Sequence, residues 1–458
     1  MTTDFVSMDK KYFFIVLAIS LLTHLLYFGY PKEVVFDEVH FGKFASDYLR
    51  GEYFFDIHPP LGKLLLAGAA KTINYDSDFD FATIGKKYPD SQYLILRLIP
   101  LLAGIFLGPI LYLIAKKLNL SNGVAFLVGF FTSIDSALIV QSRFILLDAI
   151  LLFFGFASIL FFLNFQESRK VRHLAFAGVF AALAASVKWT GLSFLGLMII
   201  FYLIRKSNFK NKFRGIINGL AFLVALPLII YFFVFIVHFL VLPKSGSGDY
   251  FHSFGFQKTL TESKYANNKT IKFLSLPRKF IEENTKLYEV NKDLSAKHSY
   301  SSKWYDWPFM IKPIFYWQGS GELSCAKIYF MGNPVIWWSG FLAVAIATGF
   351  FGIRIFQWLL GSIGDQYSQG DGLSNRNFAL AFGVVGFWLN FLPFAFISRL
   401  MFMYHYLGAL IFSILILGCL VDRIRNNKKL ILFLVFEGAL FYFIFFPFIY
   451  GISLSKWL

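Results

Sequence analysis

Two adjacent carboxylates follow directly on the first long apolar stretch of the chain. Asp37 and Glu38 lie among apolar side chains, in the segment Val-Val-Phe-Asp-Glu-Val-His-Phe-Gly at 34–42. A carboxyl group that is desolvated near a membrane surface has a raised pKa, as a general base working near neutral pH requires. We therefore interpret the pair as candidate catalytic residues. The alternative is a solvated helix start with Asp37 as its N-cap.

Four cations, Arg97, Arg143, Lys188 and Arg399, lie near the ends of later apolar stretches. Each one alone is explained by a long side chain that reaches for the membrane surface. All four are predicted on the face away from the cytosol, which normally carries few cations, so together they favour a bound anion. Arginine in a dry setting binds phosphate through paired hydrogen bonds, which makes the four cations candidates for binding a donor phosphate.

Further polar and aromatic residues are candidates for positioning a substrate, namely His58, Trp189, Tyr404 and His405. His58 belongs to the segment Asp-Ile-His-Pro-Pro-Leu-Gly-Lys at 56–63, where two prolines fix the backbone and predict a helix start at Leu61. His58 and Lys63 either contact the substrate or belong only to a turn between two surface helices.

Known cofactor and metal patterns are not apparent in the sequence. The eight histidines lack the spacing of metal ligands, and neither a Walker A loop nor a dinucleotide fingerprint is present. We predict no metal and no cofactor. A lipid-linked phosphate donor fits an outward-facing site better than a nucleotide sugar, which is a cytosolic metabolite.

Membrane-spanning helices must position these residues. The 458 residues are 57% hydrophobic and only 15% charged, whereas soluble domains have roughly 25% charged residues. Two apolar stretches, 124–163 and 174–204, are too long for one span and are interrupted by charged residues. Other apolar runs, each about 20 residues and thus long enough to cross a bilayer, occur at 12–30, 94–114, 216–240, 335–357, 378–396, 400–421 and 430–449.

Basic loops decide the number of crossings. The segments 116–117, 169–172, 205–214 and 423–429 share the cytosolic face only if both long stretches cross twice. The prediction is an all-α polytopic membrane protein with eleven spans, its N-terminus in the cytosol and its C-terminus outside. The net charge of +16 is then mostly an orientation signal, which argues against nucleic acid as a partner.

Two long external loops divide the chain into three predicted parts. A transmembrane module covers 1–240 and contains the first loop at 31–93; a large external loop that holds a few helices covers 241–334, and a four-helix transmembrane module covers 335–458. Both long loops are expected to carry function, because the spans are occupied with packing.

The first external loop is predicted to begin with an amphipathic helix on the membrane surface. Apolar residues recur there at helical spacing, at Phe41, Phe44, Ala45, Tyr48 and Leu49. Such a helix would hold the two carboxylates at the depth where a lipid-linked substrate presents its head group.

Several short motifs follow one another along most of the chain. The first is Phe-Asp-Glu-Val-His-Phe at 36–41, followed by Phe-Asp-Ile-His-Pro-Pro-Leu-Gly-Lys at 55–63. Further segments are Leu-Arg-Leu-Ile-Pro at 96–100, Val-Lys-Trp-Thr-Gly-Leu at 187–192, Ser-Lys-Trp-Tyr-Asp-Trp-Pro at 302–308, Tyr-Trp at 316–317, Gly-Asn-Pro-Val-Ile-Trp-Trp at 332–338 and Arg-Leu-Met-Phe-Met-Tyr-His-Tyr at 399–406. No single motif is specific, but the series, which covers about 34–410, resembles in its order the motifs of the protein O-mannosyltransferase family.

This resemblance implies the GT-C fold, with eleven spans and an active site at the outer face of the membrane. It implies metal-independent, inverting transfer of mannose from polyprenyl-phosphate-mannose to Ser or Thr of exported proteins. The family's acidic pair corresponds to Asp37 and Glu38, with Asp37 as the base, and its essential arginine corresponds to Arg97. Lys188, Arg399 and His405 match its later motifs. Relatives act as dimers, so a dimer is a further expectation.

One departure from the family concerns the loop at 241–334. It is too short for the MIR domain of eukaryotic members, which makes the chain similar to bacterial-type members. We therefore expect the bacterial plasma membrane, or the endoplasmic reticulum if the host is eukaryotic. Two alternatives to protein mannosylation stay open at this point. One is a GT-C enzyme that moves another lipid-linked sugar to a lipid or glycan, and the other is a transporter or flippase.

Overall fold

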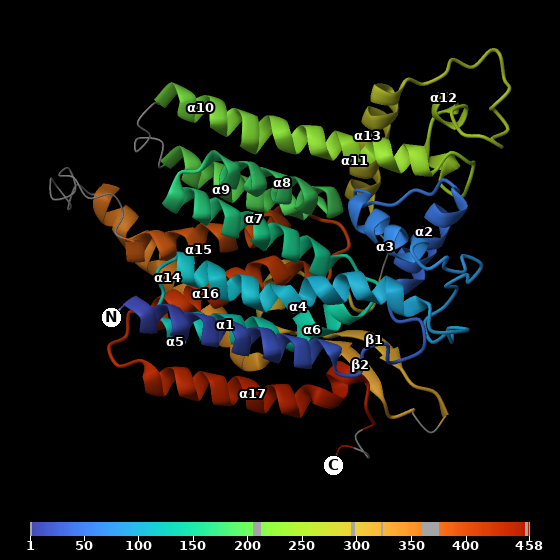
Figure 1. Ribbon diagram of the computed structural model, residues 1–458. Coiled ribbons are helices and arrows are strands. Elements are labelled where there is room, and N and C mark those ends of the chain that lie inside the picture. The colour runs from blue at the N-terminus through green and yellow to red at the C-terminus, as the bar shows by residue number, and fades with distance from the viewer. Residues whose placement is uncertain are drawn as a thin grey trace.

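The computed structural model is a bundle of long helices with a cap of short elements at one end (Figure 1). It describes residues 2–204, 212–294, 298–321, 324–359, 375–453 and 457. Residues 205–211 of the predicted basic loop at 205–214 lie outside this range. The bundle contains α1 (Thr2–Leu25), α4 (Tyr93–Lys117), α5 (Asn122–Ile134), α6 (Ser136–Arg143), α7 (Asp148–Ser168), α8 (Val171–Val187), α9 (Leu192–Ile204), α10 (Lys212–Leu220), α11 (Leu226–Val241), α14 (Pro334–Leu359), α15 (Asn375–Phe391), α16 (Leu407–Val421) and α17 (Lys428–Tyr450).

The helical membrane fold predicted from the sequence is confirmed. In the described part of the chain, seven helices are long and apolar enough to cross a membrane, and the bent pair α5–α6 makes an eighth. The helices α1, α8 and α9 pack alongside them, on α4, α7 and α15 respectively. The total of eleven spans and their orientation stay predictions.

Each of the two ambiguous stretches divides into two helical segments, as predicted. The stretch 124–163 forms the bent pair α5–α6 and then α7, and the stretch 174–204 forms α8 and α9. The bend after α5 lies at Asp135, whose carboxylate caps α6 by accepting from the Leu138 N–H at 3.1 Å. The same carboxylate accepts from the Trp337 indole at 2.9 Å and so ties α14 to the bend.

The turn between α8 and α9 brings Lys188 to the end of the bundle. Lys188 has extended backbone dihedrals, which end α8, and a short 3₁₀ turn (Trp189–Gly191) follows. A side chain at Gly191 would lie 2.4 Å from the backbone of Ala184, so the turn can close against α8 only with glycine at this position.

The cap consists of the two long loops, 31–93 and 241–334, that the sequence predicts to be external. The first contains α2 (Glu38–Arg50) and α3 (Leu61–Lys71), which begin where the sequence predicts them, and α2 buries Phe41, Ala45 and Tyr48. The second contains α12 (Phe254–Gln257), α13 (Leu276–Asp293) and 3₁₀ turns at Asp249–Phe251 and Trp304–Phe309.

An antiparallel strand pair in the second loop was not predicted. It consists of β1 (Ile314–Gln318) and β2 (Lys327–Phe330), and its register shifts between Phe315 and Trp317. Because of this bulge two successive side chains, Tyr316 and Trp317, are both buried. The pair lies at the same end of the bundle as α2 and α3 (Figure 1).

Candidate active site

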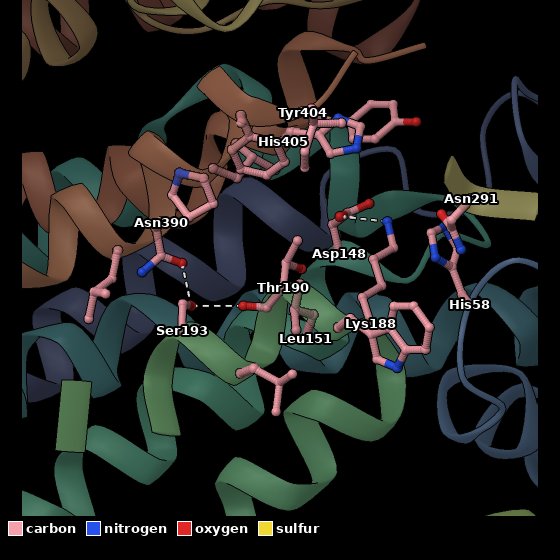
Figure 2. A pocket seen from close by; sticks show the side chains of 18 of the residues that line it. His58, Asp148, Leu151, Lys188, Thr190, Ser193, Asn291, Asn390, Tyr404 and His405 are labelled. Atoms are coloured by element: carbon pink, nitrogen blue, oxygen red, sulfur yellow. Dashed lines mark hydrogen bonds and ion pairs between the residues drawn. The ribbon is translucent and has the colours of Figure 1, made fainter. Parts of the chain in front are cut away.

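A cavity of about 740 Å³ opens at the cap end of the bundle. One end is polar and is lined by His58, Asp148, Lys188, Arg399 and His405. The rest is mainly apolar, with walls from α7, α9, the end of α15 and the segment after α15 that include Leu151, Leu389 and Phe396. Figure 2 shows the polar groups around Lys188 on one side and the Ser193–Asn390 hydrogen bond on the other.

Lys188 is held at the polar end by an ion pair. Its Nζ donates to Asp148 Oδ1 at 2.8 Å (Figure 2), and the ammonium lies 5.3 Å from the centre of the Tyr404 ring. The second carboxylate oxygen of Asp148 accepts from Gln141 Nε2 at 2.6 Å. Asp148 and Lys188 are both less than 10% exposed, so the pair is fixed in a nearly dry environment.

Asp37 is not among the residues that line the cavity, but it lies close enough to Lys188 and Asp148 for both charges to act on its carboxyl group, and its carboxylate is unbonded. It directly precedes α2, yet its side chain makes no cap hydrogen bond, and none of the residues that the structure describes donates to its carboxylate. Burial raises the pKa of Asp37 to about 7, although the nearby charge of Lys188 acts in the opposite direction. The carboxylate is therefore available to accept a proton near neutral pH, and the side-chain capping alternative is wrong.

The backbone before Asp37 adopts a strained conformation. Phe36 has φ of +44°, in the left-handed region that bulky residues rarely adopt. Its ring stacks on the Tyr316 ring at 4.1 Å and lies edge-on to the Tyr404 ring, which lines the cavity, at 6.5 Å. These two contacts fix the turn that carries Asp37.

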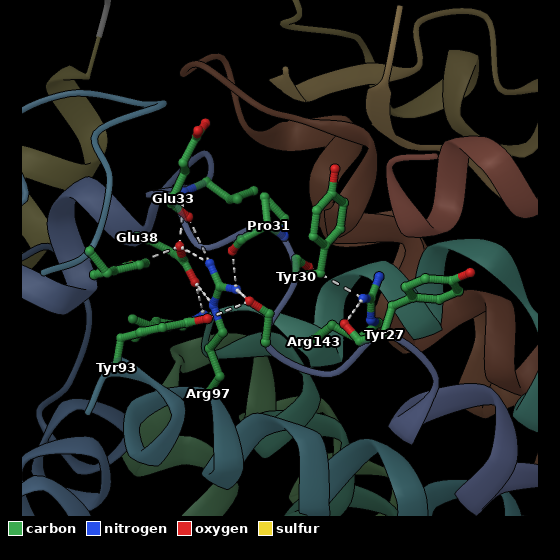
Figure 3. Close-up of polar contacts among 12 residues, drawn as sticks. Tyr27, Tyr30, Pro31, Glu33, Glu38, Tyr93, Arg97 and Arg143 are labelled. Atoms are coloured by element: carbon green, nitrogen blue, oxygen red, sulfur yellow. Dashed lines mark hydrogen bonds and ion pairs between the residues drawn. The ribbon is translucent and has the colours of Figure 1, made fainter. Parts of the chain in front are cut away.

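Glu38, the second carboxylate of the pair, points into the protein interior (Figure 3). Its oxygens accept from Arg97 at 2.7 and 2.8 Å and from the N–H groups of Val35 and Ile145 and the hydroxyl of Tyr88 at 2.8–3.0 Å. Arg97 donates its other hydrogen bonds to the carbonyls of Gly29, Pro31 and Glu33. Both side chains are fully buried.

This arrangement corrects two sequence-based interpretations. The carboxylate of Glu38 and the guanidinium of Arg97 satisfy each other, neither residue lines the cavity, and all five N–H groups of Arg97 are used. The position of Glu38 therefore does not suit a catalytic group, and the position of Arg97 does not suit a phosphate ligand. Together they anchor the start of α2 to α4.

Arg143 requires the same correction. Its guanidinium donates to the carbonyls of Ile449 at 2.9 Å and Tyr27 at 2.6 Å, and it lies 4.6 Å from the centre of the Tyr450 ring (Figure 3). The side chain is 1% exposed and does not line the cavity. It joins α6 to the ends of α1 and α17 rather than facing a ligand.

The other predicted residues do converge on the cavity: His58, Trp189, Lys188, Arg399, Tyr404 and His405. Burial lowers the pKa of His58 well below its usual value, and Lys188 and Lys63 act in the same direction, so His58 is neutral. Trp189 donates its indole N–H to the Tyr231 hydroxyl at 2.8 Å, which orients its ring at the cavity wall. Lys63, by contrast, pairs with Asp56 away from the lining.

Sequence reasoning missed the roles of Asp148, Gln141 and Tyr316. Asp148 and Gln141 are polar residues inside an apolar stretch, a signal that marks costly and therefore functional positions in membrane helices. Tyr316 belongs to the Tyr-Trp segment at 316–317 that carries part of the family resemblance, but its neighbours are aromatic as well and nothing in that segment indicates its contacts. Within the described ranges, no group of three or more His, Cys, Asp or Glu side chains could hold a metal ion.

Two family models match the chain. The model for dolichyl-phosphate-mannose-protein mannosyltransferase covers residues 14–243, and the model for the C-terminal four-transmembrane region of protein O-mannosyltransferase covers residues 276–457.

Among curated relatives, dolichyl-phosphate-mannose–protein mannosyltransferase 1 of Saccharomyces cerevisiae is 34% identical over 52% of this chain and 31% of its own length. Mannosyltransferase 4 of the same yeast is 33% identical over 58% of this chain and 38% of its own length. The aligned part of the chain thus spans about a third of the length of these relatives.

A solved structure of the S. cerevisiae protein O-mannosyltransferase Pmt1-Pmt2 complex, bound to the sugar donor, is similar over almost the whole chain. The likeness covers 97% of this chain and 90% of the solved chain, with a TM-score of 0.87 and 21% identity. At that identity the likeness shows the fold, and it confirms the GT-C fold that the motif order implies.

Proposed function

The chain belongs to the dolichyl-phosphate-mannose-protein mannosyltransferase family, and on that premise we propose that it transfers mannose from polyprenyl-phosphate-mannose to Ser or Thr hydroxyls of exported proteins. The observation that carries this proposal is the unbonded carboxylate of Asp37 beside a cavity with cations at one end and apolar walls beyond. Such a cavity suits a phosphate that has a sugar on one side and a hydrocarbon chain on the other.

The donor would be held through its phosphate and its lipid. Lys188 and Arg399, both in the lining of the polar end, would face the phosphate charge. Leu151, Leu389 and Phe396 would contact the prenyl chain. The neutral imidazole of His58 and the ring of Trp189 would border the sugar, where an aromatic face can stack on its apolar side.

The proposed reaction uses one base and one leaving group. Asp37 takes the proton of the acceptor hydroxyl while that oxygen attacks C1 of mannose. The bond between C1 and the phosphate oxygen breaks, and polyprenyl phosphate leaves with the electron pair. A single displacement inverts the anomeric centre, by the logic that also governs inverting glycosidases.

Electrostatic stabilisation of the leaving phosphate is the larger contribution that we propose. Removing one preorganised partner of a developing charge typically costs about 10²–10³-fold in rate. Lys188 is preorganised by its ion pair with Asp148, and it can exchange part of that contact for phosphate. We propose that these cations suffice and that the transfer needs no metal ion or other cofactor.

The proposal also covers the membrane face of the reaction, the membrane in which the protein lies and its oligomeric state. The reaction is proposed at the extracytoplasmic face, since Asp37 and His58 belong to a loop predicted outside. We propose the bacterial plasma membrane as its location, with the endoplasmic reticulum as the alternative in a eukaryotic host. A solved family member is a complex of two chains, which supports the proposal of a dimer.

The test is a transfer assay with purified protein in nanodiscs and EDTA throughout. Radiolabelled polyprenyl-phosphate-mannose is supplied with a Ser/Thr-rich peptide or with the same peptide carrying alanine at those positions. We expect label on the hydroxyl peptide alone. Label that instead reaches a lipid or glycan acceptor would contradict the protein acceptor, and the absence of any mannose transfer would contradict the reaction.

A further inference from the structure

Tyr316, in the strand β1, is connected to both halves of the candidate site, to Asp37 through its neighbour Phe36 and to Lys188 through Gln141 and Asp148. Its side chain is fully buried, and it lies outside the cavity lining. We propose that Tyr316 is a positioning residue that fixes the base Asp37 and the cation Lys188 relative to each other. This inference rests on the proposed function, because it assigns the two groups their roles in mannose transfer.

The first contact reaches Asp37 through Phe36. The two rings stack at 4.1 Å with an angle of 8° between their planes, and the Phe36 N–H donates to the Tyr316 carbonyl at 3.2 Å. Phe36 has φ of +44°, a conformation that persists only where its surroundings enforce it. The ring and carbonyl of Tyr316 supply that enforcement, so they determine where the next residue, Asp37, projects.

The second contact reaches Lys188 through a chain of hydrogen bonds. The Tyr316 hydroxyl donates to Gln141 Oε1 at 2.6 Å, Gln141 Nε2 donates to Asp148 Oδ2 at 2.6 Å, and Lys188 Nζ donates to Asp148 Oδ1 at 2.8 Å. The phenol donor fixes which end of the Gln141 amide faces Asp148. Without that hydroxyl, the amide would keep its bond to the Asp148 carboxylate but Gln141 Oε1 would lose the donor that fixes it from the other side.

These two contacts use different parts of one side chain, which makes them separable. The ring and backbone of Tyr316 contact Phe36 and so position Asp37, whereas its hydroxyl bonds to Gln141 and so positions Lys188. Active-site groups need to be held within about 0.5 Å of their productive positions, and second contacts of this kind provide that precision. A loss of the hydroxyl should weaken donor binding, and a loss of the ring should slow the proton transfer.

The experiment compares five variants of the full chain in nanodiscs, four single ones and the double variant Tyr316→Phe/Gln141→Met. Tyr316→Phe removes only the hydroxyl, Gln141→Met breaks the next link, and Tyr316→Leu removes the ring. Tyr329→Phe is the matched control, since Tyr329 lies on the paired strand β2 opposite Phe315. The donor KM and kcat are measured together with the dissociation constant of polyprenyl phosphate, which does not require turnover.

Tyr316→Phe and Gln141→Met should each raise the donor KM and the dissociation constant about tenfold, as expected for losing one buried hydrogen bond. Their kcat should stay within about threefold of the wild-type value. The lost interaction stabilises the bound substrate and the transition state equally, so its loss raises the donor KM and leaves kcat nearly unchanged. The double variant should be no worse than either single one, since both interrupt one chain. Tyr316→Leu should in addition lower kcat at least tenfold, and Tyr329→Phe should match the wild type.

The inference is overturned if the wild type transfers mannose and both Tyr316→Phe and Gln141→Met leave the donor KM and the dissociation constant within twofold. It is also overturned if the double variant shows the product of the two single effects. If Tyr316→Phe does not fold, Gln141→Met alone decides the same point. A wild type that neither transfers mannose nor binds polyprenyl phosphate would overturn the inference together with the proposed function.

Discussion

Asp37 and Glu38 are neighbours in the chain but have opposite surroundings. Glu38 accepts five hydrogen bonds and is fully buried, whereas the Asp37 carboxylate accepts none from the described residues. Saturation with donors stabilises the charged form of a carboxyl group, while burial without donors stabilises the neutral form. The same Asp-Glu pair thus supplies an anchor and a proton acceptor, and only the second is suited to catalysis.

The pH dependence of kcat/KM follows from the state of Asp37. The base must be deprotonated, and burial raises its pKa to about 7, so activity should fall as the pH decreases through about 7. The negative charge of Asp148 contributes to this raised pKa. Asp148→Asn should therefore move the acidic limb of the remaining activity to lower pH. A wild-type midpoint near 4, or an upward shift in Asp148→Asn, would contradict the assignment.

At the residue scale the sequence was informative about which residue types matter and less about where they point. The order of motifs led to Lys188, Arg399, His58 and Tyr404, all of which line the cavity. Arg97 and Arg143 have the same sequence signature, a cation near a span end. Their guanidinium groups bond to backbone carbonyls of the segment after α1, however, and those contacts depend on the folded loop rather than on local sequence.

At the scale of elements, the buried ion pair between Glu38 and Arg97 joins α2 to α4. Breaking a buried ion pair from one side leaves an uncompensated charge and typically costs about 3–5 kcal/mol. Arg97→Leu should therefore lower the free energy of unfolding by roughly that amount, measured by SDS denaturation in mixed micelles. Lys117→Met, which breaks the exposed pair with Glu167, is the control and should change it by less than about 1 kcal/mol.

The outcome would be different if Arg97 were a phosphate ligand. Arg97→Leu would then leave the unfolding free energy close to that of the wild type and would selectively weaken the binding of polyprenyl phosphate. That pattern would restore the interpretation from sequence alone.

At the element scale the helices were predictable and the strand pair was not. The starts of α2 and α3 follow from helical spacing and from two prolines, and the breaks in the long apolar stretches follow from polar interruptions. In β1 the bulge places Tyr316 and Trp317 inward in succession, which removes the alternation that identifies a strand. Tyr316, which is connected through Phe36 and Gln141 to the two halves of the candidate site, therefore lies in the element that was missed.

The whole molecule consists of a helical bundle and a cap at one end, with the N-terminus at the far end of the bundle from the cap (Figure 1). The orientation of this arrangement in the membrane is predicted from the basic loops of the sequence, since residues 205–211 lie outside the described range. Orientation is accessible to experiment through the two native cysteines.

Cys325 is free and exposed next to β2, whereas Cys419 is buried in α16. If the cap faces outward, a membrane-impermeant maleimide should label the chain in intact cells of a bacterial host, and Cys325→Ser should abolish the labelling. In sealed microsomes the same residue should be protected until the membrane is opened. Labelling with the reverse dependence on permeabilisation would contradict the predicted orientation.

The most direct test of the central claim compares mannose transfer with donor binding in Asp37→Asn. The raised pKa means that folding disfavours the charged carboxylate above its unfolded pKa, so the neutral variant should be at least as stable as the wild type at pH 8. We predict that it binds polyprenyl phosphate with an affinity close to that of the wild type and transfers label to the hydroxyl peptide at least 10²-fold more slowly. Asp37→Asn that retains a substantial part of the transfer rate would contradict the role of Asp37 as the base.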